Sequence, residues 1–372
     1  MALNSRSELL AAESAAQTAT MQSGLSTQPT SNPQAIPSPG NVTATPEGGA
    51  TQAVAPPSTV GLSSTFELGG QVPGFIANPN VMRQAGMTWV KFQIKWNTTT
   101  DPTLARDMVN AGHQNGFKVL LSISGDPYPQ QIDFASYVAF LEQVAAYQPD
   151  AIEVWNEMNL NREWPEGQQS PPSYVTNMLA PAYSAIKAVS PNTSVIIGAR
   201  APTGLDDGVI AWADARYVQG LAAAGAAEYA DCIGVHHNSG TTSPSARTGH
   251  VSDAGDGHYS WYFLPTIEVY YEGMNRALPV CLTEFGYFSP DGFPGPVPAN
   301  FAWGAENTIQ EQAAWLAEGA QIAKDLGYIP LMIVWNVDFT KWEPDDPQAG
   351  YAILRPDGTC PACGPLRAVA QN

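Results

Sequence analysis

Short apolar runs rich in β-branched and aromatic residues recur along the chain, and each has the length of a buried strand. The eight runs cover residues 64–70, 87–96, 117–124, 151–157, 194–200, 232–238, 279–287 and 331–339. The stretches between them carry apolar residues at helical spacing, and several end in a glycine or proline that stops a helix. The clearest predicted helices cover residues 102–116, 134–147, 173–189, 261–277 and 306–327.

Strands that alternate with helices form a parallel sheet covered by those helices. Eight such units in about 310 residues fit a closed (β/α)8, or TIM, barrel. The alternative is an open doubly wound sheet, which usually carries a glycine-rich nucleotide loop after its first strand. The segment FELGGQVPG, residues 66–74, contains neither that loop nor a P-loop. We therefore predict an α/β fold of the (β/α)8 barrel type and no nucleotide site.

Residues 1–60 do not follow this rhythm. They consist mainly of Ala, Ser, Thr, Gln, Pro and Gly, with almost no aromatic residues and no apolar periodicity. Such a segment buries too little apolar surface to offset the entropy lost on ordering. We predict a disordered Ala/Ser/Thr/Pro-rich linker or tether over residues 1–60, followed by one folded domain over residues 61–372.

The charge distribution disfavours several classes of partner. The net charge is −18, and only six residues are lysine, so no basic patch suggests nucleic acid or an anionic membrane. No run of about 20 apolar residues predicts a membrane span. The first 20 residues show no apolar core of a secretory signal. The Ser/Thr/Pro tether, the many Trp and Tyr residues and the scarce lysines nevertheless favour an extracellular or cell-surface protein.

Four cysteines form two groups. Cys360 and Cys363 lie in a Gly/Pro-rich tail, where they form a local disulfide or remain free thiols. Cys232 and Cys281 fall on the sixth and seventh predicted strands. Strand alternation places Cys232 on the inward face and Cys281 on the outward face, beside the helices, which argues against a disulfide between them.

The carboxyl ends of barrel strands meet at one mouth, where barrel enzymes carry their chemistry. Residues predicted at this end are dense in carboxylates, imidazoles and indoles: Glu67, Lys95, Trp96, Asn156, Glu157, His236, Glu284 and Trp335. Cleaving a glycosidic bond requires two carboxyl groups flanking the anomeric carbon, one holding a proton and one ionised. Glu157 ends the fourth strand and Glu284 ends the seventh, so both could face one mouth.

The segment WNEMN (residues 155–159), followed later by LTEFG (residues 282–286), resembles the clan A glycoside hydrolases, retaining enzymes with a (β/α)8 barrel. The likeness is greatest to family 39-like and family 5-like members and covers residues 61 to about 355. It implies that Glu157 is the acid/base, that Glu284 is the nucleophile and that Asn156 donates a hydrogen bond to the sugar 2-hydroxyl. It also implies that residues 61–372 are a glycoside hydrolase catalytic domain.

Three positions depart from the clan pattern. Met158 follows the acid/base where proline is common, and strand two offers Lys91 and Lys95 where many members carry arginine. Strand six ends in GVHHN, where the clan often presents His and Tyr. These departures leave both catalytic carboxylates in place.

Aromatic residues suggest how a sugar would be held. Trp335 at the end of strand eight is a flat stacking platform for sugar C–H faces, or ordinary core. His236 should face inward and His237 toward the helices. Long loops with Trp164 and Trp261 would wall a groove over several sugars, which favours endo cleavage. Glu67, Lys95 and Trp96 are the remaining predicted substrate-binding residues.

We expect no cofactor and no catalytic metal, because the first strand lacks an H-x-H motif, although His250, Asp253, Asp256 and His258 share one loop. The predicted function is a monomeric retaining O-glycoside hydrolase acting on β-linked poly- or oligosaccharides. The alternatives are a non-catalytic carbohydrate-binding barrel, and an exo-glycosidase or transglycosylase on the same scaffold.

Overall fold

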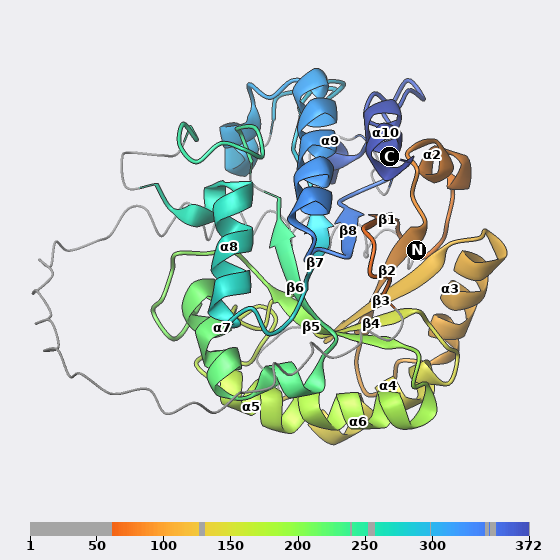
Figure 1. The fold of residues 1–372 in the computed structure, drawn as a ribbon, viewed down its shortest axis with the longest axis vertical. Helices are drawn as coiled ribbons and strands as arrows, with labels where there is room; N and C mark the ends of the chain where they lie inside the picture. Colours follow the sequence, from red (N-terminus) through yellow and green to blue (C-terminus); the bar gives the residue numbers. More distant parts are fainter. Residues whose placement is uncertain are drawn as a thin grey trace, which may run out of the picture.

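The computed structural model describes residues 62–125, 131–238, 240–251, 257–297, 299–338, 342 and 347–371. The predicted tether, residues 1–60, lies outside the described residues. The sheet is a closed barrel in the order β1 to β8, so the predicted (β/α)8 fold is confirmed (Figure 1).

All eight neighbouring strand pairs are parallel, and β1 pairs with β8 to close the barrel. The strands are β1 Glu67–Gln71, β2 Trp89–Trp96, β3 Lys118–Gly125, β4 Ala151–Val154, β5 Ser194–Arg200, β6 Cys232–His237, β7 Val280–Phe285 and β8 Leu331–Val334. Each lies within or overlaps a predicted run.

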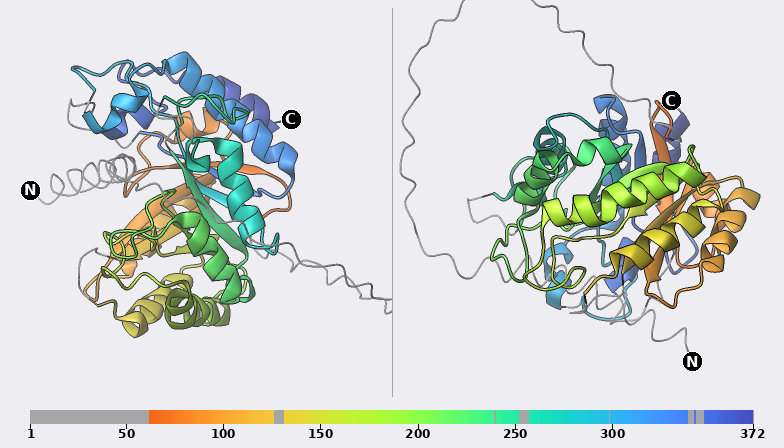
Figure 2. Two further views of the ribbon diagram at one scale, coloured as in Figure 1. Left: turned by 90° about the vertical axis from the view of Figure 1, so that its left-hand side faces the viewer. Right: turned by 90° about the horizontal axis from the view of Figure 1, so that it is seen from below.

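Helices surround the barrel, as Figure 1 shows, and Figure 2 gives two further views of them. They are α2 Pro79–Gln84, α3 Thr103–Gln114, α4 Phe134–Ala145, α5 Pro171–Tyr174, α6 Ala180–Val189, α7 Asp214–Ala223, α8 Phe263–Gly273, α9 Ile309–Leu326 and α10 Cys363–Gln371. A π-helical turn, Val175–Leu179, joins α5 to α6. The five helices predicted from sequence are confirmed, and α9 begins with a capping box formed by Thr308 and Glu311.

Two apolar cores flank the strands. The outer core lies between sheet and helices and takes alternate residues of β2, namely Val90, Phe92, Ile94 and Trp96. The inner core fills the barrel and contains Leu62, Trp89, Leu120, Ala151, Ile196, Cys232, Cys281, Leu331 and Ile333. The face of β2 that points into the barrel therefore carries Trp89 at the bottom of the barrel, and Lys91 and Lys95 nearer its mouth.

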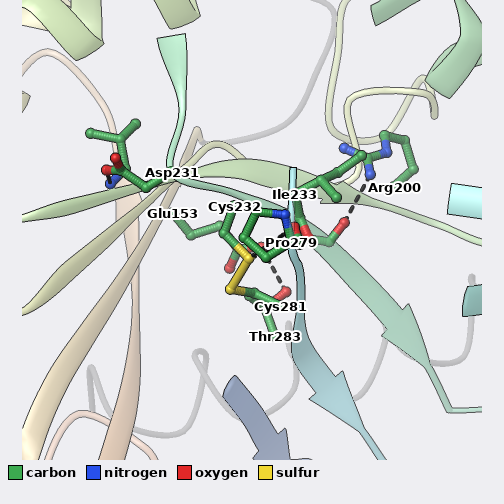
Figure 3. The surroundings of a disulfide bond; sticks show 10 residues. Glu153, Arg200, Asp231, Cys232, Ile233, Pro279, Cys281 and Thr283 are labelled. Atoms are coloured by element: carbon green, nitrogen blue, oxygen red, sulfur yellow. Dashed lines mark hydrogen bonds between the residues drawn. A yellow bond between two sulfur atoms is a disulfide. The ribbon is translucent and has the colours of Figure 1, made fainter. Parts of the chain in front are cut away.

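Cys232 and Cys281 form a disulfide inside the barrel between β6 and β7, so the prediction against this bond is wrong (Figure 3). Cys281 belongs to the inner core, and the Thr283 hydroxyl reaches Glu153 across the barrel. The strand register shifts beside Glu284, between Val235 and His236 on one side, so simple alternation fails at this point. Cys281, Thr283 and Glu284 thus all point inward.

The tail cysteines also form a disulfide, between Cys360 and Cys363 at the start of α10. This settles the alternative that the sequence left open. No cysteine among the described residues is free.

Candidate active site

Glu157 lies just beyond the end of β4, in a backbone of left-handed conformation. The φ angles of Trp155 and Glu157 are 73° and 41°, values that are uncommon for residues other than glycine and that cluster at functional sites. The turn sends the Trp155 indole outward, where its nitrogen donates to the Glu163 carbonyl at 2.7 Å. The Glu157 amide donates to the Ala199 carbonyl at 2.7 Å, which anchors the turn on β5.

The Glu157 carboxylate is almost fully buried and contacts two basic side chains. One oxygen pairs with the Arg162 guanidinium from the loop after β4. The other lies 3.2 Å from Nδ1 of His236 on β6. Arg162 was not singled out from the sequence, because its loop position carries no periodic signal.

The Glu284 carboxylate at the end of β7 also has donors on both oxygens. Nζ of Lys91 lies 3.1 Å from Oε1, and Nδ2 of Asn238 donates to Oε2 at 3.1 Å. Nε2 of His236 lies 3.8 Å from Oε1. His236 therefore lies close to the carboxylates of both Glu157 and Glu284. The catalytic roles of the two glutamates stay predictions.

His236 links the two carboxylates through its two ring nitrogens. Burial alone would lower the pKa of His236, but the charges of Glu284 and Glu157 outweigh burial and raise that pKa. The inward placement of His236 is as predicted. His237 faces the outer core against Phe263 and Phe285, also as predicted, and burial lowers its pKa to about 3.

A charged pair lies beneath the carboxylates on the barrel axis. Lys91 on β2 and Glu153 on β4 are both fully buried, with 3.6 Å between Nζ and Oε2. Burial opposes the charge on Glu153, yet Lys91, His236 and hydrogen bonds from Thr283 and Ala199 lower its pKa. The sequence analysis missed Glu153, although a charged residue inside an apolar strand four positions before Glu157 is a usable signal.

Two predicted binding residues at the mouth converge on Glu163. Nζ of Lys95 lies 3.1 Å from Oε1 of Glu163, and Nδ2 of Asn156 donates to the same oxygen at 3.4 Å. Glu163 was not predicted. The role of Asn156 toward a sugar hydroxyl stays a prediction.

Two predicted tryptophans lie in the mouth-side segments. Trp335 follows β8, packs with Phe288, Phe301 and Tyr351, and is 8% exposed. Trp261 is 9% exposed and stacks on His250 with ring centroids 5.2 Å apart. Their contacts with sugar stay predictions.

The structure contradicts three other predicted binding residues. Glu67 begins β1 at the opposite end of the barrel, where it pairs with Lys118 at the start of β3. Trp96 points outward onto Tyr137 of α4, because its neighbour Lys95 takes the inward phase. Trp164 is buried against Trp155 rather than lining a wall.

Within the described ranges, no group of three or more His, Cys, Asp or Glu side chains could hold a metal ion. Asp253 and Asp256 of the loop noted above lie outside these ranges. No helix in the described part of the chain is both long and apolar enough to cross a bilayer.

No protein-family model and no curated protein matches the chain. Solved structures with the same barrel include a family 39 glycoside hydrolase from Bacteroides cellulosilyticus, at 17% identity and a TM-score of 0.54 over 82% of this chain. The chain covers 64% of the length of that protein.

Xylanases share the fold to a similar degree. A thermostable mutant of a Cellvibrio japonicus xylanase matches at 14% identity and a TM-score of 0.56, covering 82% of this chain and 98% of that one. A family 10 endoxylanase from a sugarcane soil metagenome matches at 14% identity and 0.53, covering 82% and 97%. The chain therefore has the (β/α)8 fold of these glycoside hydrolases, and identities this low establish the fold alone.

Proposed function

We propose that this protein is a retaining O-glycoside hydrolase that cleaves β-linked poly- or oligosaccharides. The observation that carries the proposal is the placement of Glu157 and Glu284 at one barrel mouth, bridged by His236. Two carboxyl groups that flank a bound sugar are what glycosidic cleavage requires. The fold shared with a family 39 glycoside hydrolase and with xylanases supports the same class of reaction.

The reaction proceeds in two displacements. The Glu284 carboxylate attacks the anomeric carbon while the glycosidic C–O bond breaks, and the leaving oxygen takes a proton from Glu157. Water then attacks the glycosyl–enzyme ester, gives its proton to Glu157 and frees Glu284. Lys91 and Asn238 hold the two oxygens of Glu284, which fixes the attacking group in place.

We propose further that cleavage is endo-acting on a polymer and that the protein works outside the cytoplasm. The fold shared with a family 10 endoxylanase supports the first proposal. Two disulfides support the second, because such bonds persist in oxidising compartments.

Replacement of the two glutamates tests the proposed function. Glu284→Ala should abolish turnover of an activated aryl glycoside. Glu157→Ala should slow turnover and regain rate with added azide, which replaces water without needing a general base. Glu67→Ala is the matched control, because this glutamate lies at the other end of the barrel. Unimpaired turnover by Glu284→Ala or Glu157→Ala would contradict the proposal.

A carbohydrate-binding barrel without catalysis is the second candidate. The low exposure of Glu157 and Glu284, 1% and 5%, together with donors on all four oxygens, favours this reading. Calorimetric titration with oligosaccharides separates the two functions. Binding without release of new reducing ends would favour the binding barrel.

A further inference from the structure

The buried Lys91–Glu153 pair has no evident role in stability. Both side chains are fully buried beneath the mouth. Removing two charges from water costs about as much as their mutual attraction returns, so a buried ion pair adds little net stability. The contacts of this pair instead lead to the residue beside the proposed nucleophile.

Thr283, directly before Glu284, is held from both sides by the pair. Nζ of Lys91 donates to the Thr283 carbonyl at 3.0 Å, and the Thr283 hydroxyl donates to Oε1 of Glu153 at 2.8 Å. The same Glu153 oxygen accepts the Ala199 amide of β5 at 3.1 Å. Glu153 thus joins β4 to β5 and β7, and its partner Lys91 joins β2 to β7.

These contacts fix Thr283 at a point where the pairing of β7 with its neighbouring strands is irregular. The register of β7 shifts on both sides of this segment, against β6 and against β8. Regular ladder hydrogen bonds are interrupted at such a shift, so side-chain contacts must fix the direction of the following residue. That following residue is Glu284.

We propose that Glu153 is a positioning residue for Glu284: it fixes Thr283 and the Lys91 ammonium, and through them the place and charge of the nucleophile. This inference rests on the proposed function, in which Glu284 is the nucleophile. Glu153 itself does not touch the reacting atoms. It acts through Lys91, whose Nζ lies 3.1 Å from Oε1 of Glu284.

The charged groups around this pair come from several strands. His236 of β6 and Glu284 of β7 face it from the mouth, and Glu157 with Arg162 lies beyond His236. A change of charge at Glu153 should therefore reach His236 as well as Lys91, because both lie within its electrostatic field.

Two variants test the proposal, with a matched control pair. Glu153→Gln removes the charge but keeps the shape, and Lys91→Met with Glu153→Leu replaces the pair by apolar side chains. The control is Lys118→Met with Glu67→Leu, a lysine–glutamate pair at the opposite end of the same barrel. Thermal unfolding identifies any variant that fails to fold.

We expect Glu153→Gln to lower kcat about 100-fold with little change in KM. The Lys91 ammonium that contacts Glu284 loses the charge that holds it, and small misplacement of a reacting group carries costs of this order. The acid limb of its pH profile should also move. The apolar double variant should fold and lose kcat, and the control pair should keep wild-type kcat. A folded Glu153→Gln variant with wild-type kcat and pH profile would overturn the inference.

A second measurement does not depend on turnover. Ring NMR signals of His236 followed against pH should show a lower titration midpoint in Glu153→Gln than in the wild type, because a nearby carboxylate that favours the imidazolium is lost. An unchanged midpoint would overturn the inference even if the wild type were active. If the wild type cleaves no glycoside, the proposed function fails, and a lowered midpoint would still support the role of Glu153 in setting the charge of this site.

Discussion

The disulfide inside the barrel should contribute more stability than the disulfide in the tail. Cys232 and Cys281 are separated by 49 positions in the sequence, whereas Cys360 and Cys363 are separated by 3. A cross-link stabilises mainly by restricting the unfolded chain, and the restriction grows with the logarithm of the loop length. The perturbation is therefore the loss of each bond in turn, in Cys232→Ala/Cys281→Ala and in Cys360→Ala/Cys363→Ala.

The loop lengths set the expected magnitudes. At 25 °C a loop of 49 residues corresponds to about 4 kcal/mol of unfolding free energy, and a loop of 3 to about 1.5 kcal/mol. Cys232 and Cys281 are also fully buried, so truncation to alanine adds a cavity cost to the first variant.

Urea unfolding of the two double variants and the wild type measures these differences. We expect the internal variant to lose at least 2 kcal/mol more than the tail variant, by a rough reckoning from the loop lengths. Thiol titration of the denatured wild type should find no free thiol, because all four cysteines are paired. Equal losses in the two variants, or two reactive thiols from Cys232 and Cys281, would refute the reasoning.

Three further predictions concern single side chains. Burial lowers the pKa of His237 from 6.5 to about 3. The contribution of His237 to the free energy of unfolding is therefore fully present above pH 6.5 and is lost as pH falls toward 3. In the wild type this group changes the free energy of unfolding by at most about 1.4 kcal/mol per pH unit. His237→Phe should therefore make the free energy of unfolding, measured in urea, fall less steeply as the pH is lowered. An unchanged slope would contradict the buried, neutral state of His237. Glu153→Leu alone should cost about 3–5 kcal/mol, because the buried Lys91 ammonium loses one of its two carboxylate partners and keeps Glu284, and because the Thr283 hydroxyl loses its acceptor. Adding Lys91→Met should recover part of this cost in the same assay, and a double variant as unstable as the single one would count against the prediction. Trp335→Ala should raise KM for oligosaccharides about 10-fold if the ring stacks on sugar. Trp164→Ala removes a core side chain and should instead lower the free energy of unfolding by about 3–5 kcal/mol. The reverse pattern would assign sugar stacking to Trp164 and core packing to Trp335.

The fold was predictable because each strand left a strong local signal. Runs of β-branched and aromatic residues marked all eight strands, and the carboxylates at the ends of β4 and β7 followed directly from the strand positions. The opposite facings of His236 and His237 followed from alternation counted from Cys232, which lies inside the barrel as His236 does.

The errors arose where alternation breaks or strand limits are ambiguous. The face of Cys281 was counted backward from Glu284 across a register shift, and one extra residue in the count reverses every assignment below it. Glu67 was placed at the wrong end because β1 begins at this residue rather than ending near it. Lys95 and Trp96 are adjacent, so only one of them could face the barrel interior.

Residues from loops could not be found by periodicity at all. Arg162, Glu163 and Asn238 reach the site through turns whose course depends on tertiary contacts. Trp155 and Glu157 take left-handed backbone conformations that no residue pattern announces.

Incubation with a panel of β-glucans, xylans, mannans, galactans and bacterial exopolysaccharides, with products read by mass spectrometry, tests the central claim most directly. Endo-acting hydrolysis predicts a ladder of short oligosaccharides from one polymer, which disappears with Glu284→Ala. Release of single sugars only would keep the hydrolase and contradict endo cleavage. An absence of products from every polymer and from aryl glycosides, in a folded protein that binds oligosaccharides, would contradict the hydrolase itself.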